Sequence, residues 1–114
     1  MSEPRLFTLS EARMLMPEVR RVTREAVTAV EQIQEQVSAL DTLTPEVMAE
    51  AEKDMRGAVD AWASTIEGLG AQAKGLWLVD FDNGAGYYCW QHPEPELAHY
   101  HDYDSGFAGR TPIQ

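Results

Sequence analysis

The chain has 114 residues, and its 19 acidic residues against nine Lys and Arg give a formal net charge of −10. This length predicts one domain spanning residues 1–114. The acidic balance argues against nucleic acid or an anionic membrane as a partner, because both bind clustered Lys and Arg. The single cysteine excludes an intrachain disulfide and favours a reducing compartment, and no apolar run long enough for a signal peptide or a membrane span is present. We therefore expect a cytoplasmic protein.

The N-terminal part of the chain predicts a first amphipathic helix. Thr8 and Glu11 have the spacing of a capping box, in which each side chain accepts a hydrogen bond from a free backbone amide. Apolar residues then recur at spacings of three and four from Val19 to Leu40, as on one face of a helix. Pro17 interrupts the pattern, and we expect a kink or a new helix start beside it.

A second helix is predicted after a short loop. Thr44 is placed to cap it, and Pro45 takes the first helical position, where a missing amide is tolerated. Apolar residues again follow at helical spacing, and Gly68 and Gly70 mark the end. Two helices joined by a short loop pack antiparallel, so residues 8–71 predict a helical hairpin.

The periodicity changes to that of strands near the end of this hairpin. Apolar and aromatic runs at 76–81 and 87–91 flank Asn83-Gly84, a pair typical of β-hairpin turns. Residues 97–103 are a candidate third strand. We expect an α+β fold in which an antiparallel two-helix hairpin is followed by a small two- or three-stranded antiparallel sheet. In this prediction residues 75–114 form a β-hairpin and an acidic, aromatic tail segment.

The residues with chemical potential are concentrated in this C-terminal segment. Residues 75–114 contain all three His, the only Cys and eight of the ten aromatic residues. They also contain six acidic residues and a single basic one, Arg110. A segment with this charge density favours a bound cation, or Arg110 itself, as its internal counter-charge.

A divalent metal is one such cation. His99 and His101 are two residues apart in the candidate third strand, so they share one face of it. Sets of His and carboxylate ligands suit Zn, Mn or Fe. The candidate metal ligands are His101, Glu94 and Asp104. The same residues also fit an exposed strand with solvent-facing side chains. The wider set of ligand-binding candidates comprises His101, Glu94, Asp104, Asp80, Arg110 and Trp90.

Two further features have alternative interpretations. Cys89 could be a nucleophile with a His base, although its place within a strand is more typical of a small packed side chain. Gly106 and Gly109 precede Arg110, a pattern that could hold an anion through backbone amides and a guanidinium. Arg110 could instead form an ion pair with Asp104 or Glu94. No recognised nucleophile and base pair occurs, so whether the protein is an enzyme is left open.

The chain resembles a small bacterial family known only as a domain of unknown function. The resemblance extends over nearly the whole chain and rests on three stretches, which are Phe7-Thr8-Leu9-Ser10-Glu11-Ala12, Cys89-Trp90 with Glu94-Pro95-Glu96, and Asp104-Ser105-Gly106-Phe107-Ala108-Gly109-Arg110. It implies that the hallmark residues are Asp80, Cys89, Trp90, Glu94, His101, Asp104, Gly106 and Arg110. The family varies at the position of His99, which leaves His101 as the better metal-ligand candidate.

Two functional hypotheses follow. In the first, the protein is a small-ligand or metal-binding domain with a polar site in the C-terminal segment. His101 is then a metal ligand or general base, with Arg110 as the charge partner of the acidic residues. In the alternative, the protein is a homo-oligomeric interaction module whose helical hairpins pair as a four-helix bundle, for example in a homodimer.

Overall fold

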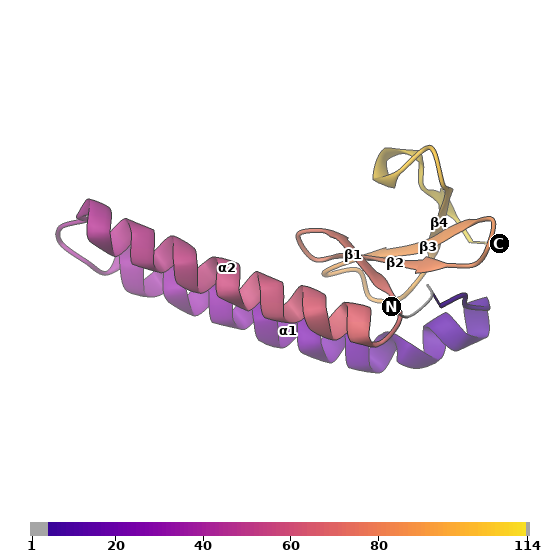
Figure 1. Cartoon of the computed structure of the whole chain (residues 1–114), viewed down its shortest axis with the longest axis horizontal. Helices are drawn as coiled ribbons and strands as arrows, with labels where there is room; N and C mark the ends of the chain where they lie inside the picture. The colour runs from indigo at the N-terminus through magenta and orange to yellow at the C-terminus, as the bar shows by residue number, and fades with distance from the viewer. Residues whose placement is uncertain (1–4, 114) are drawn as a thin grey trace.

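Two long helices form an antiparallel pair in the computed structural model of the chain, which describes residues 5–113. Helix α1 spans Leu9–Ser38 and helix α2 spans Pro45–Gly68. The capping box at Thr8 and the cap at Thr44 are both present, as predicted. The predicted α+β fold, a helical hairpin followed by an antiparallel sheet, is confirmed (Figure 1).

Helix α1 continues through Pro17 and does not start again there. Proline removes one intrahelical hydrogen bond, but Met16 and Val19 on either side of it are buried in the core. Their packing keeps the two parts of the helix together. Figure 1 shows the first turns of α1 set at an angle to the rest, as expected for a kink at a proline.

Five antiparallel strands follow in the order β1-β2-β3-β4-β5, with each strand next to its neighbours in the sequence. Two short edge strands extend the predicted sheet of two or three strands. The first of them begins two residues after Gly70, whose φ of 93° turns the chain out of α2. A 3₁₀ turn, η1 (Phe107–Gly109), precedes the last strand. The strands are β1 (Gln72–Gly75), β2 (Leu78–Asp82), β3 (Gly86–Gln91), β4 (His99–Asp102) and β5 (Thr111–Pro112).

The turn between β2 and β3 forms at Asn83-Gly84, as predicted. Gly84 has φ of 94°, and the Asn83 side chain accepts hydrogen bonds from the amides of Ala85 and Gly86, both at 2.9 Å. The turn spans Asn83 to Gly86 and is centred on Gly84 and Ala85, and with this centre the strand register places Asp80 opposite Cys89. This pairing determines which side chains meet on the sheet.

The core lies between the helices and the inner face of the sheet, which carries Val79, Phe81 and Trp90. Trp62 of α2 is buried beside these residues and donates a hydrogen bond of 2.8 Å to the Thr23 hydroxyl of α1. The sheet covers only one end of the helix pair (Figure 1). The other end, residues 26–58, projects beyond it and is called the arm below. Neither described helix is both long and apolar enough to cross a membrane.

Candidate functional site

A cluster of three buried side chains lies on the outer face of the sheet, opposite the core. Asp80 on β2, Cys89 on β3 and His101 on β4 each offer one ligand atom, and these atoms all lie within 4.8 Å of one another. The residues are 2%, 0% and 5% exposed, respectively. They share this face because side chains alternate along a strand and the three strands are in register. We call these residues the outer-face trio.

The His101 ring is held in a defined orientation. Its Nδ1 lies 2.8 Å from the backbone oxygen of Asp102, and its Nε2 lies 3.1 Å from Asp80 Oδ2. A carbonyl oxygen can only accept, so Nδ1 carries the proton and donates it. The Nε2 atom and the carboxylate oxygen then require a shared proton or another cation between them. A hydrogen bond from Nδ1 to a backbone carbonyl is also the usual support of a metal-binding histidine.

Asp80 has one carboxylate oxygen without a partner. Its Oδ1 is fully buried, no N–H or O–H group in the described part of the chain donates to it, and the polar group beside the carboxyl is the Cys89 thiol, a weak donor. Leaving such an acceptor unpaired costs about 1–3 kcal/mol or more for a charged group. Buried polar atoms in proteins are seldom left in this state, and an unpaired one indicates a place where a ligand or ion can bind.

The Cys89 thiol keeps its proton at neutral pH. Burial raises its pKa to about 12, the negative charge of Asp80 adds to this effect, and Arg110 opposes it. Activated cysteine nucleophiles have a lowered pKa, so this environment argues against that role for Cys89. A transition metal could still bind here, because coordination displaces the thiol proton.

A second polar cluster lies beside the trio and is built around Glu94. Its Oε1 accepts hydrogen bonds from Arg110 at 2.9 Å and from the Gln91 amide at 2.7 Å, and its Oε2 lies 3.5 Å from His99 Nδ1. Burial acts to raise the pKa of Glu94, but the hydrogen bonds from Arg110 and Gln91 outweigh it, so the pKa lies below its usual value. Arg110 thus forms an ion pair with one of the two acids named as its possible partners.

The six candidate residues named from the sequence therefore occupy four places. Asp80 and His101 meet in the trio, and Glu94 and Arg110 form the neighbouring ion pair. Asp104 is exposed in the loop after β4, and Trp90 is buried on the inner face, where its indole donates to the Glu94 backbone oxygen at 2.9 Å.

Cys89 is the member of the trio that the sequence interpretation did not include among the ligand candidates. A partial signal was present in the sequence. A two-residue turn at Asn83-Gly84 would pair Asp80 with Tyr87 and would place Cys89 on the same face, two residues further along β3. The observed turn runs from Asn83 to Gly86 and pairs Asp80 with Cys89 directly.

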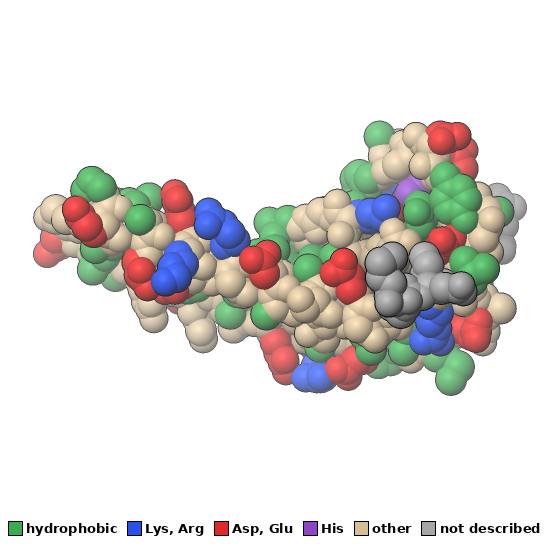
Figure 2. Space-filling view, in the orientation of Figure 1, with side chains coloured by type: hydrophobic (Ala, Val, Ile, Leu, Met, Phe, Trp, Pro, Cys, Tyr) green, Lys and Arg blue, Asp and Glu red, His purple; other side chains and the backbone are tan. Residues whose placement is uncertain are grey.

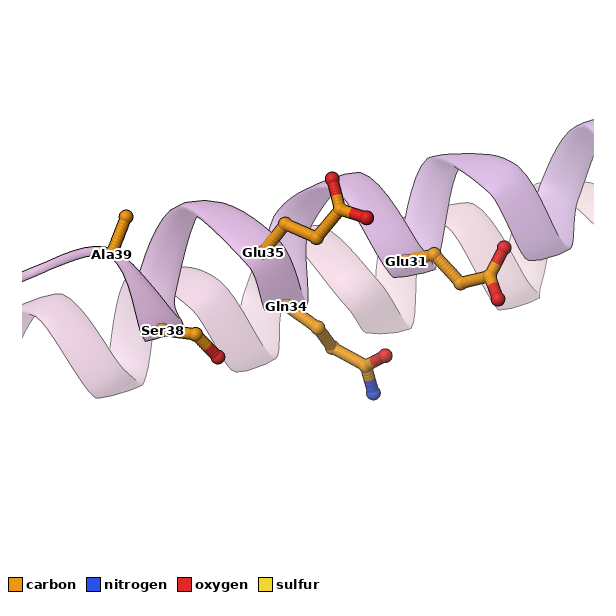
Figure 3. Close-up of a pocket in the computed structure, with 5 residues that line it drawn as sticks. All are labelled: Glu31, Gln34, Glu35, Ser38 and Ala39. Atoms are coloured by element: carbon orange, nitrogen blue, oxygen red, sulfur yellow. The ribbon is translucent and has the colours of Figure 1, made fainter.

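A hollow of about 500 Å³ lies elsewhere on the surface, along the last turns of α1. Its lining side chains do not converge on a common point (Figure 3). They are Glu31, Gln34, Glu35, Ser38 and Ala39. This open, polar groove offers no buried group and no focused charge, so we assign the candidate site to the trio.

Fold and site together define a small α+β protein with a buried Asp, Cys and His cluster on its sheet. The chain belongs to a family described as an uncharacterised conserved protein (DUF2203), whose model matches residues 5–113. The resemblance to a domain of unknown function is therefore confirmed. No curated protein and no solved structure matches the chain.

Proposed function

We propose that the protein binds a transition-metal ion, Zn(II) or Fe(II), through Asp80, Cys89 and His101. The observation that carries the proposal is the convergence of three buried ligand atoms, one of them on a carboxylate with an unpaired oxygen. The thiol favours these metals over Mn(II), which prefers oxygen ligands. Compared with the set expected from the sequence, the proposed site keeps His101 and has Asp80 and Cys89 in place of Glu94 and Asp104.

The spacing of the trio supports this proposal. In a tetrahedral zinc site, bonds of 2.0–2.3 Å place neighbouring ligand atoms roughly 3.5 Å apart. The trio atoms lie within 4.8 Å of one another, so closure around an ion needs movements of about 1 Å. Three protein ligands leave one position of a tetrahedral ion open. Such a position can accept a water molecule or a small ligand, and a bound ion acts there as a Lewis acid.

Titration with Co(II), a spectroscopic substitute for Zn(II), tests the proposal. Protein purified without an affinity tag should bind one equivalent and develop an absorption band of thiolate-to-cobalt charge transfer. Cys89→Ser should abolish the band, and His101→Gln should weaken binding by at least tenfold. Glu94→Gln and Asp104→Asn serve as matched controls and should retain it. Absence of a thiolate band, or its loss in the Glu94 and Asp104 variants, would contradict the assignment.

We also propose a cytoplasmic location. A thiol kept protonated inside the fold, with no second cysteine to pair with, suits a reducing compartment.

The arm supports a second proposal, which is that the protein forms a homodimer through its helical hairpin. The radius of gyration is 16.3 Å, against about 13 Å for a compact domain of this length. Leu40, Leu43 and Met48 at the arm tip are 39–51% exposed, and Figure 2 shows hydrophobic side chains there among charged ones. Grooves of about 190 and 260 Å³ lie along the arm, and both include Val37 and Ala51.

The net charge of the arm favours a second copy of this chain as its partner. The arm carries seven acidic and two basic residues, a net charge of −5. The part of α1 under the sheet contains four arginines, Arg13, Arg20, Arg21 and Arg24. Two arms packed antiparallel would bury one of the two apolar grooves of each copy, and would bring the acidic arm of each copy toward this less acidic part of α1 in the other.

Light scattering coupled to size-exclusion chromatography tests the homodimer. The protein should elute with twice the chain mass, and Val37→Asp should return it to a monomer while circular dichroism stays helical. Lys53→Asp introduces the same side chain at an exposed position of the arm and should leave a dimer. A monomer across a wide range of protein concentration would contradict this proposal and leave the metal site unaffected.

A further inference from the structure

A small pocket on the other side of the molecule gathers positive charge. It has a volume of about 150 Å³ and lies between α1 and the segment that links β3 to β4. Arg20 and Arg24 line it from the helix, and His92 lines it from the linking segment. The pocket is unusual in a chain with a net charge of −10.

The two arginines are not neutralised. They are four residues apart on one helix face, where like charges repel each other. Within residues 5–113, neither makes an ion pair with a carboxylate, and Arg20 donates only to the backbone oxygen of Pro95. Arg21, on the same helix, shows the usual arrangement, since it pairs with both Glu18 and Glu25.

The only carboxylate that lines the pocket has its charge used elsewhere. Glu94 Oε1 accepts hydrogen bonds from Arg110 and the Gln91 amide, and the Arg110 guanidinium compensates the charge of Glu94. The buried Trp90 ring also lines the pocket, and its ring centre lies 6.3 Å from that of His92. The pocket thus combines a rigid aromatic wall with two guanidinium groups that have free N–H donors.

We propose that this pocket binds one small oxyanion, either a phosphoryl or a carboxylate group, between Arg20 and Arg24. Its volume equals that of about five water molecules in the liquid, which suits one such group and is too small for a nucleotide. The anion relieves the repulsion between the two arginines and can take hydrogen bonds from both. Trp90, on the inner face of the sheet, and the two arginines of α1 are not part of the trio, so this proposal is independent of the metal proposal.

NMR titration of the Trp90 indole N–H signal, assigned with Trp90→Phe, tests the site. Inorganic phosphate and acetate are added separately at constant ionic strength, so that general screening stays the same. At least one should shift the signal saturably, and the stronger of the two identifies the chemical class. Arg24→Gln, which breaks no hydrogen bond to the fold, should weaken binding about tenfold, as expected for the loss of a charge-assisted contact.

Arg56→Gln on α2 provides the control, because it removes the same charge from an exposed position away from the pocket. It should change the anion affinity by less than twofold. No saturable shift with either anion, or equal weakening in the Arg24 and Arg56 variants, would overturn the proposal. Cobalt binding by Arg24→Gln should match that of the unmodified protein, so failure here is distinguishable from failure of the metal site.

Discussion

The reactivity of Cys89 toward a thiol reagent is a direct test of the environment described for the trio. The pKa of this thiol is raised from 9.0 to about 12, and the residue is 0% exposed. Three pH units reduce the thiolate fraction at neutral pH about a thousandfold, and only the thiolate reacts. We therefore expect native Cys89 to react at least about 1,000 times more slowly than the same cysteine in the unfolded chain.

The assay compares the rate of thiol modification by a chromogenic disulfide reagent in buffer and in concentrated urea at one pH. A metal chelator is present throughout, so that the measured protection comes from the fold alone. Cys89→Ser supplies the blank, because the chain has no other cysteine. Repeating the native measurement with added zinc in place of the chelator should lower the rate further, whereas the His101→Gln variant should need at least tenfold more zinc for the same protection.

One result would refute this reasoning. A native rate within tenfold of the unfolded rate would show a thiol that is accessible and ionised at neutral pH. The outer face would then resemble the site of an activated nucleophile. The proposed role of Cys89, a protonated thiol that loses its proton only when a metal binds, would be wrong.

Three further predictions concern stability. Thr23→Val should lower the free energy of unfolding, measured in urea, by about 2 kcal/mol, because it leaves the Trp62 indole N–H unpaired. In a Trp62→Phe background the same change should cost little, and equal losses in both backgrounds would contradict this. Arg110→Gln should cost about 1 kcal/mol at pH 7. Since the folded pKa of Glu94 is lowered, this loss should shrink as the pH falls through that pKa and the carboxylate takes up a proton; a constant loss would contradict the ion pair. The folded pKa of Cys89 is raised, so stability should decline as the pH rises above 9, and Cys89→Ala should remove part of that decline.

The elements that the sequence predicts well are those set by local contacts. Thr8 and Thr44 cap their helices through hydrogen bonds to amides three residues away. Asn83-Gly84 forms its turn within four residues. The short edge strands had no such local signal. Gln72–Gly75 has no apolar alternation, and Thr111–Pro112 pairs only because β4 presents a free edge.

The site shows the same division between local and long-range information. Asp80 and His101 are ligand candidates from their side-chain types alone, but the contact between them depends on the register of three strands. Asp104 stood beside His101 in the sequence and was an equally good ligand candidate. The Asp102 carboxylate accepts hydrogen bonds from the amides of Asp104 and Ser105, and this turn leaves Asp104 exposed to solvent. Sequence separation is therefore a poor guide to which polar side chains meet on a sheet.

The sheet covers only one end of the helix pair, and this affects where the protein unfolds locally. The arm projects beyond the sheet, so the backbone hydrogen bonds near its tip can break without disturbing the core under the sheet. Amide hydrogen exchange should therefore be fastest near the loop between α1 and α2 and become slower toward Trp62 and Val19. The same gradient makes the tip the first place for a protease to cut, while the sheet and its trio persist as a separate cooperative unit.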